Sequence, residues 1–439
     1  PGKDENWPSW LGGPNREKGH HGLERGQANL YRAFYLLRED IEKQGLLEKK
    51  IDHDLDPDTP KVTRSEAYAE MAKRSFKRMS RQVITRSVAN QSLHNYKAAY
   101  RIYEVLKTTD PQWAKQEKER MIRLAEITSG ARRNPETHHY HFSPKGLSNE
   151  NNFSAGYGSG NPGNLATVAQ MSGFQVLKDR LPAAFRAYSH FLYPGNNSEG
   201  YRRLNKVEWI SGRSYKGFPG TREYLRNYYA AYELEIPAAV RHHELYDKHN
   251  LGRKGVGMIR YEKLSGHTEI AVLGAVERVS TLHETVSRQQ DGSELPPSDY
   301  RLPYEREGNT AYVDEFLNAG AIRFGDATMF FQVWDDHLVR LRYMTPEYDR
   351  FAHVTYRNSG PEMTAKFGRG KVFKTLRYGP VFIVMNGSEK KQFEFRVPAD
   401  MQDTGVVNLV TGKSVRLNER GTLPPATSAA FVPAGSQGE

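Results

Sequence analysis

The sequence predicts an α+β protein of more than one domain, with a helical N-terminal part and a C-terminal part of antiparallel strands. Up to about residue 250, apolar residues recur mostly with the spacing of a helix. After about residue 252 the spacing shifts toward two, the period of a strand. The 439 residues are enough for two or three domains. We therefore expect a helical domain over residues 1–250 and a β-rich domain over residues 251–439.

The helical part is predicted to contain several helices joined by two long polar loops. The apolar face of the first helix carries Leu30, Phe34, Leu37 and Ile41. Later helices are expected at residues 64–107, from Asp110 to about Gly130, and at 164–192 and 222–248. Asp110 is the expected N-cap of its helix, with Pro111 in the first helical position. Successive helix pairs indicate a bundle or an (α/α) toroid, and no repeat motif separates the two.

The β-rich part is predicted to be an antiparallel β-sandwich of short strands separated by turn residues. Strands are expected in AIRFG, MFFQVW, HLVRLRYM, KVFKTLRY, VFIVMN, KQFEFRV, VVNLV, SVRLN and SAAFV. In KQFEFRV, the apolar residues Phe393, Phe395 and Val397 alternate with polar ones. NLVTGKSVRL indicates a hairpin with a Thr-Gly turn.

The composition favours an anionic partner. The formal net charge is +11, and the 25 Tyr and 5 Trp residues offer flat apolar faces with polar tips. No nucleic-acid motif or Lys/Arg-rich tail is present, so we expect an acidic polysaccharide rather than a nucleic acid. No apolar run reaches the roughly 20 residues of a membrane span, so no membrane insertion is expected. The lack of cysteine fits an exported bacterial protein, secreted or periplasmic, and leaves the oligomeric state open.

The first polar loop, residues 131–165, carries candidate functional groups. It contains a Tyr between two glycines, three His and a run of amides with one carboxylate: Tyr157, His138, His139, His141, Asn149, Glu150 and Asn151. The flanking glycines leave the Tyr157 phenol open to a polymer. The alternative is that Tyr157 packs against a neighbouring helix and the glycines only make turns.

The second polar stretch, residues 194–221, interleaves basic and aromatic side chains. The candidates are Tyr201, Arg202, Arg203, Trp209, Arg213 and Tyr215. Arg binds carboxylates through two parallel hydrogen bonds, and aromatic rings stack on sugar faces. The alternative is a solvated loop with ordinary surface charges.

A third group lies on the helix predicted around residues 84–104. Asn90 and His94 are four residues apart, as are Gln91 and Asn95, so they occupy neighbouring strips of one helical surface. Two amides and an imidazole on a helix rich in Tyr and Ala indicate a lined cleft. Exposed polar residues are the alternative.

Taken in order, these features resemble the toroidal polysaccharide lyases of the chondroitin AC, hyaluronate and xanthan lyase type. That family has an Asn on a helix, a His in a polar loop, a Tyr in a Tyr-Gly turn soon after it, and an Arg well downstream. The matching pieces, within about residues 85–225, are Asn90 or Asn95, one of His138, His139 and His141, Tyr157 in AGYGS, and Arg213 in SGRSY. The three His lie further before Tyr157 than in the family, so Asn149 or Asn151 is an alternative at that position.

The resemblance implies an (α/α) toroid followed by a β-sandwich, and cleavage of a uronate-containing polysaccharide by β-elimination. The implied roles are Tyr157 with His139 or His141 as base and acid, and Arg213 with Asn90 or Asn95 at the uronate carboxylate. The remaining candidates are expected to bind the substrate: His94, Asn149, Glu150, Asn151, Tyr201, Arg202, Arg203, Trp209 and Tyr215. No cofactor is required, although a structural zinc or calcium ion is compatible with the family.

Two other functions remain open at this point. A glycoside hydrolase needs two facing carboxylates, which Glu150, Glu199 and Glu208 or the cluster Asp326, Asp335 and Asp336 offer. A non-catalytic glycan-binding protein needs only aromatic platforms. A metal site in THHYH is a further alternative, because alternating His139 and His141 would share one face of a strand.

Overall fold

The computed structural model describes most of the chain in two compact units. The described residues are 31, 33, 34, 37, 39–51, 58, 60–150, 153–154, 158–196, 202–206, 227, 229–249, 295–333, 339–345, 352–356, 363–367 and 372–435. Unit 1 is Pro1–His141, Asn164–Asp179 and Asn250–Leu295, and unit 2 is Phe142–Gly163, Arg180–His249 and Pro296–Glu439. The domain boundary predicted at residues 250 and 251 falls outside the described residues, so it stays a prediction.

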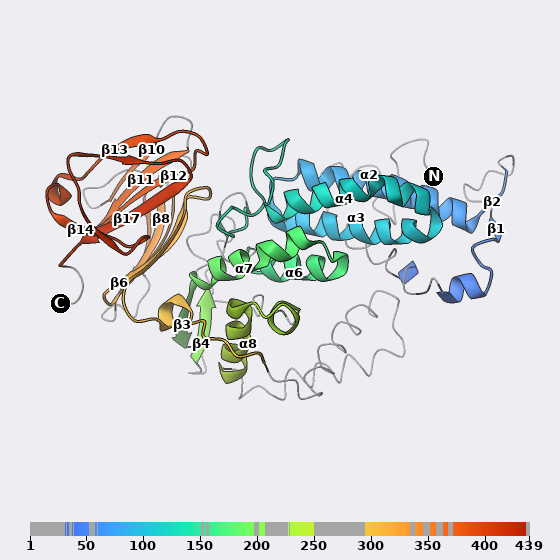
Figure 1. Cartoon of the computed structure of the whole chain (residues 1–439), viewed down its shortest axis with the longest axis horizontal. Helices are drawn as coiled ribbons and strands as arrows, with labels where there is room; N and C mark the ends of the chain where they lie inside the picture. The colour runs from blue at the N-terminus through green and yellow to red at the C-terminus, as the bar shows by residue number, and fades with distance from the viewer. Residues whose placement is uncertain are drawn as a thin grey trace. The chain divides into compact units, whose positions relative to one another are not determined.

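Unit 1 is built around three helices that lie side by side (Figure 1). They are α2 (Arg64–Thr85), α3 (Ala89–Thr109) and α4 (Pro111–Ser129). The predicted start of α4 is confirmed: the Asp110 side chain accepts a hydrogen bond from the Trp113 amide at 3.0 Å, and Pro111 is the first helical residue. Gly130, at φ 74°, ends the helix where the sequence predicts.

Around these helices, unit 1 differs from the prediction in detail. Of the predicted apolar face of the first helix, Leu37 is exposed, while Tyr31 and Ala33 are buried. The segment after it contains two short paired strands, β1 (Lys50–Ile51) and β2 (Val62–Thr63).

The predicted single helix at 164–192 is two helices, α6 (Asn161–Ser172) and α7 (Gln175–Ser189). Gly173 separates them because its φ of +68° is a left-handed conformation that a helix cannot continue. The boundary between the two units falls inside α6 and inside α7.

Unit 2 contains two antiparallel sheets. The first has five strands in chain order: β5 (Thr310–Asp314), β6 (Ala319–Phe324), β7 (Ala327–Val333), β8 (Val339–Met344) and β9 (Ala352–Tyr356). The second has the order β10-β11-β12-β17-β14-β15. Its strands are β10 (Met363–Phe367), β11 (Phe373–Tyr378), β12 (Val381–Asn386), β17 (Thr427–Pro433), β14 (Gly405–Asn408) and β15 (Lys413–Arg416).

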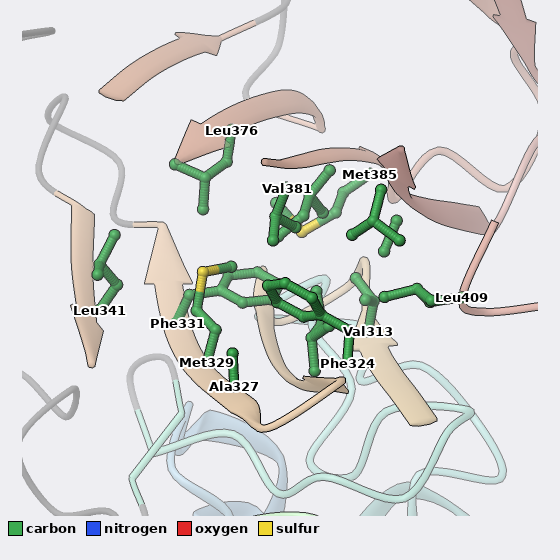
Figure 2. Close-up of a cluster of buried hydrophobic side chains, with 14 of the residues drawn as sticks. Val313, Phe324, Ala327, Met329, Phe331, Leu341, Leu376, Val381, Met385 and Leu409 are labelled. Carbon is green, nitrogen blue, oxygen red and sulfur yellow. The ribbon is translucent and has the colours of Figure 1, made fainter. Parts of the chain in front are cut away.

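The two sheets share one hydrophobic core (Figure 2). Met329 and Phe331 of β7 and Leu341 of β8 face Leu376 and Met385 of the second sheet. In β7 and β12, alternate residues enter this core, as the strand period requires: Ala327, Met329, Phe331 and Val333, and Val381, Ile383 and Met385. Burial of these large side chains supplies the main stabilisation of this layer.

Two local strand predictions are confirmed. The NLVTGKSVRL segment forms the β14–β15 hairpin, in which Gly412 has a φ of +71°. Phe395 and Val397 are buried, with Phe393 packed against the same cluster. Phe393 and Phe395 belong to β13 (Phe393–Arg396), which pairs with β16 (Arg420–Leu423), and Val397 directly follows this strand.

The polar region before the sheets is partly regular. A hairpin of β3 (Leu192–Asn196) and β4 (Arg202–Lys206) precedes a π-helical turn at Tyr229–Glu233 and helix α8 (Pro237–His249). The helix predicted at 222–248 is thus divided in its described part, because Glu235 adopts a φ of 49° just before Pro237. The chain is therefore α+β, with a helical N-terminal region and a β-rich C-terminal region, which confirms the coarse part of the predicted fold class, whereas the (α/α) toroid stays a prediction.

Candidate functional site

The predicted site residues fall into the two units, and each group is described within its own unit. Unit 1 contains Asn90, Gln91, His94, Asn95, His138, His139 and His141. The other predicted residues belong to unit 2.

The polar residues predicted on α3 differ in burial, and whether they line a cleft stays a prediction. Asn90 and His94 are half-buried, whereas Asn95 is fully buried between Leu93 and Tyr96, which are also buried. The Asn95 side chain is buried, and its helix α3 packs against both α2 and α4. Asn95 is therefore a polar residue at a core position of the helical packing.

The Asn95 amide has no hydrogen-bond partner within the described part of the chain, at either Nδ2 or Oδ1. Its exposed fraction is 0%. Buried polar groups are nearly always hydrogen-bonded, because an unmet donor or acceptor costs about 1–3 kcal/mol. An amide with two unused N–H donors is suited to bind an anionic oxygen.

His141 is held at the end of α2. Its Nε2 lies 2.7 Å from the carbonyl oxygen of Arg86, the residue that ends this helix. Asn134 supports the same junction by donating from Nδ2 to the Ile84 carbonyl oxygen at 2.7 Å. Burial lowers the pKa of His141, so the imidazole is neutral at pH 7. In this position His141 is a buried anchor, and its catalytic role stays a prediction.

The other histidines of this loop differ from His141 in exposure. His138 and His139 are exposed, and His138 has a left-handed φ of 57°. Residues 137–141 form no strand, so His139 and His141 do not share a strand face. Among the described residues, no three His, Cys, Asp or Glu side chains gather as a metal site.

In unit 2, Lys145 of the first polar loop contacts residues of the two sheets. Its ammonium group donates to the Val313 carbonyl oxygen at 2.7 Å and to Ser428 Oγ at 3.1 Å. It also forms an ion pair with Glu315, whose side chain is almost fully buried. Burial raises the pKa of Glu315 to about 7 even though Lys145 favours its ionised form.

The same loop segment packs closely on α7. Gly146 has a φ of +104°, and a Cβ there would overlap the Ala183 carbonyl oxygen. Arg180 donates to the Pro144 carbonyl oxygen at 3.3 Å. Ser143 Oγ donates to the Asp314 carboxylate at the end of β5. The base of the loop is thus fixed by contacts with both a helix and a strand.

Further along, four buried side chains form a hydrogen-bonded group that we call the 148–188 cluster: Ser148, Glu150, Asn161 and Tyr188. Asn161 Nδ2 donates to Ser148 Oγ and to Glu150 Oε1, both at 2.8 Å. Ser148 Oγ lies 2.7 Å from Tyr188 Oη on α7. The exposed fraction is at most 1% for each of the four.

This burial bears on the substrate-binding predictions for the first loop. Glu150 is 1% exposed and Asn149 is 7% exposed. Both side chains therefore lie within unit 2, as Asn95 lies within unit 1, and a polymer reaches none of the three without rearrangement of the chain. Asn161 and Tyr188 were missed by sequence reasoning, because one begins a helix and the other lies on an ordinary apolar helical face.

Several predicted residues lie outside the described part of the chain. These are Asn151, Tyr157, Tyr201, Trp209, Arg213 and Tyr215, and also the hydrolase candidates Glu199, Glu208, Asp335 and Asp336. Arg202 and Arg203 belong to β4, where only the backbone is described. The remaining hydrolase candidate, Asp326, is exposed beside Gly325 in the turn between β6 and β7.

No family model, curated protein sequence or solved structure matches this chain. Within the described residues, no helix is both long enough and apolar enough to cross a membrane.

Proposed function

We propose that the protein is a polysaccharide lyase that cleaves an acidic, uronate-containing polysaccharide by β-elimination. A base removes the proton at C5 of the uronate, the bond from C4 to the glycosidic oxygen breaks, and an acid protonates that leaving oxygen. The C5 proton becomes acidic enough only when hydrogen-bond donors or positive charge neutralise the adjacent carboxylate. The reaction needs no oxidant or reductant, and we propose no required cofactor.

The roles are assigned to the residues that the sequence singles out. Tyr157 is the proposed base, and it or a His of the first loop, His139 or His141, returns the proton. Asn95 or Asn90 and Arg213 neutralise the carboxylate. Of the histidines, His139 is exposed and can meet a polymer without rearrangement of the chain.

The observation that carries this proposal is the unpartnered amide of Asn95. A buried amide that uses none of its hydrogen bonds within the described chain is costly to stability, and such costs are typical of functional sites. In a site of low polarity, a donor aimed at a carboxylate that gains charge in the transition state is worth several kcal/mol. The net charge of +11 adds long-range attraction for a polyanion.

We further propose that the helical region is an (α/α) toroid-like catalytic domain followed by a β-sandwich domain, and that the protein acts in the bacterial periplasm or outside the cell. The α+β order along the chain is compatible with this arrangement. The two sheets that share the core of Figure 2 are of the kind a sandwich requires.

The test is a panel of uronate polymers, including chondroitin sulfate, hyaluronate, alginate and polygalacturonate. A lyase produces an unsaturated uronate that absorbs in the near ultraviolet, whereas a hydrolase releases new reducing ends without that absorbance. Tyr157→Phe should keep substrate affinity and lose turnover. Reducing ends without absorbance, or binding without any product, would each replace the lyase proposal.

A further inference from the structure

A groove lies between helices α2 and α4 of unit 1, which run side by side in Figure 1. Its volume is about 430 Å³, which is the size of a small-ligand site. Ile84 near the end of α2 lines one side, and seven residues of α4 between Gln116 and Ile127 line the other. Gln116 and Arg123 of this lining are exposed, so a ligand in solution can reach the groove.

The groove has an apolar lining. Leu124 and Ile127 are buried, and Ile84 is half-buried. The two walls are held together by Phe76 of α2, which packs edge-on against Trp113 of α4 with ring centroids 5.0 Å apart. One face of a sugar ring carries only C–H groups, and such a face can pack on aliphatic side chains of this kind.

The α4 wall carries two arginines three residues apart, Arg120 and Arg123, which are neighbours on the helix surface. The Arg120 guanidinium lies 5.8 Å from the centre of the Phe76 ring and 3.5 Å from the Glu117 carboxylate, and these contacts hold it over α2. Arg123 is exposed and forms no ion pair with the described residues. Its guanidinium can therefore bind a carboxylate through two parallel hydrogen bonds.

The α2 wall adds Lys77 and Arg81, which precede Ile84 by seven and three residues and therefore lie on the same strip of the helix. Both are exposed, and neither forms an ion pair within the described part of the chain. Residues 71–85 contain no acidic side chain. Because like charges four residues apart weaken a helix, an anion bound beside this strip stabilises it.

The charges around the groove favour an anionic ligand. Besides these four basic residues, the lining contains two carboxylates, Glu117 and Glu119, and Glu117 is already paired with Arg120. The Gln116 amide offers hydrogen-bond donors and an acceptor to hydroxyl groups. A uronate residue matches this combination, because it has a carboxylate, hydroxyl groups and an apolar ring face. The phosphate backbone of a nucleic acid matches the charge but makes no use of the apolar lining.

The groove adjoins the loop that carries His139, one of the proposed proton donors. Asn134 donates from Nδ2 to the Ile84 carbonyl oxygen at 2.7 Å, and its backbone amide donates to the His139 carbonyl oxygen at 2.9 Å. Asn134 thus joins the α2 wall to the segment of His139, whose side chain is exposed. A ligand in the groove is therefore close to a loop that the proposed reaction uses.

We infer that the α2–α4 groove binds a uronate residue of the acidic polysaccharide, an inference that rests on the lyase function proposed above. Arg120 and Arg123 bind the carboxylate, Lys77 and Arg81 attract the polyanion, and the apolar lining packs against the sugar ring. The groove contacts the polymer in the same way before and during the reaction, so it lowers KM and leaves kcat unchanged.

The first test compares two charge-matched double variants, Arg81→Ala with Arg123→Ala and Lys115→Ala with Lys118→Ala. Lys115 and Lys118 are exposed residues of α4 that do not line the groove. Calorimetry with hyaluronate, polygalacturonate, chondroitin sulfate and alginate at low salt measures binding, with dextran as the neutral reference. We expect about 10-fold weaker binding for the groove pair and a change of less than about twofold for the control pair. On a polymer that the wild type cleaves, the groove pair should raise KM about 10-fold with kcat within about twofold.

Gln116→Trp tests the space in the groove, because the indole fills it and leaves the charge unchanged. We expect this variant to weaken binding about as much as the groove pair does, with an unchanged circular dichroism spectrum. Gln116→Ala leaves the space open and should weaken binding less.

The outcomes separate this inference from the lyase function. Equal losses of affinity in the groove and control pairs, or full affinity in the groove pair and in Gln116→Trp, overturn the groove and leave the lyase function standing wherever unsaturated product forms. Single-stranded DNA that binds through the same arginines more tightly than every uronate polymer also overturns the inference, in favour of a nucleic-acid site. Binding of a uronate polymer through the groove without any unsaturated product supports the groove and overturns the lyase function.

Discussion

The middle of α3 and the loop that follows α4 each contain a fully buried asparagine, and the two side chains differ in their hydrogen bonding. Asn134 donates to the Ile84 carbonyl oxygen at 2.7 Å and accepts from the backbone amides of Glu136 at 3.0 Å and Thr137 at 3.2 Å. Asn95 is buried to the same degree, at 0% exposure, and forms no hydrogen bond with the described residues.

The contrast separates a structural amide from a candidate functional one. Asn134 replaces lost water contacts with protein contacts and so stabilises the loop that carries His141. Asn95 loses its water contacts on burial and forms no hydrogen bond with the described residues in exchange. An apolar residue in its place should therefore raise the free energy of unfolding. Binding a carboxylate is a use that matches the chemistry of the Asn95 amide.

The largest expected effect is on activity, from Asn95→Leu, which keeps the branching and the number of non-hydrogen side-chain atoms and removes every hydrogen-bonding group of the side chain. We expect kcat on the substrate polymer to fall about 100- to 1000-fold, as when a donor to a developing oxyanion is lost. Stability should stay the same or rise by up to about 1 kcal/mol in urea unfolding. A clear fall in stability would mean that the amide is structural, and the contrast with Asn134 would disappear.

The same substitution at Asn134 is expected to lower stability instead. Asn134→Leu leaves the Ile84 carbonyl group and the amides of Glu136 and Thr137 without their partner, all near the end of α2. We expect a loss of about 3 kcal/mol in the free energy of unfolding. Urea denaturation followed by circular dichroism measures it, and a loss below about 1 kcal/mol would contradict the assignment of Asn134 as a structural amide.

Glu315 extends the comparison to an ionisable group in unit 2. Its pKa is raised from 4.5 to about 7, with Lys145 and Asp314 as the charged neighbours. The folded state therefore holds the Glu315 proton more tightly than the unfolded state does, and stability falls as pH rises between these two values. Deprotonation of Glu315 should lower the free energy of unfolding by about 2 kcal/mol between pH 5 and pH 7.

The pH measurement is a difference between the wild type and Glu315→Gln. Asp314, whose pKa burial also raises, changes stability in the same direction in both proteins, so the difference isolates Glu315. Urea unfolding at several pH values should show a flatter pH dependence in Glu315→Gln. Parallel curves for the two proteins would show that Glu315 titrates normally.

The smallest expected effect comes from a part-buried hydrogen bond near the surface, which sets the scale for the buried ones. Asp110 caps α4 through the Trp113 amide and forms an ion pair with Lys73. Asp110→Ala should cost about 1 kcal/mol, whereas Asp110→Asn keeps a good cap and should cost less. Thermal unfolding compares the two, and equal losses would assign the effect to the ion pair instead of the cap.

The predictions that succeed rest on neighbouring residues in the sequence. The N-cap at Asp110, the helix end at Gly130 and the β14–β15 hairpin each follow from a few adjacent side chains and their backbone preferences. Alternation predicts the buried positions of β13 for the same reason. The break at Gly173 was missed because one glycine inside an apolar pattern is also tolerated in a continuous helix.

The candidate site was predicted less well, because polarity in a sequence does not reveal burial. Glu150 and Asn149 were expected to face a substrate, and both are buried. Glu150 accepts a hydrogen bond from the side-chain amide of Asn161, eleven residues later, and no local sequence pattern predicts that bond. The partners of Lys145 are still more distant, since Ser428 follows it by 283 residues.

The change from helices to strands along the chain, the capped ends of α4 and the alternation of buried positions in β13 follow from the sequence alone, because each depends on interactions within a few residues. Which polar side chains are buried, and which of them find partners, was decided only when distant segments packed together. Asn95 and Asn134 are the same residue type in the same unit, and nothing local distinguishes them. One meets backbone groups on folding and the other has no hydrogen-bond partner among the described residues, so only the three-dimensional structure distinguishes the two.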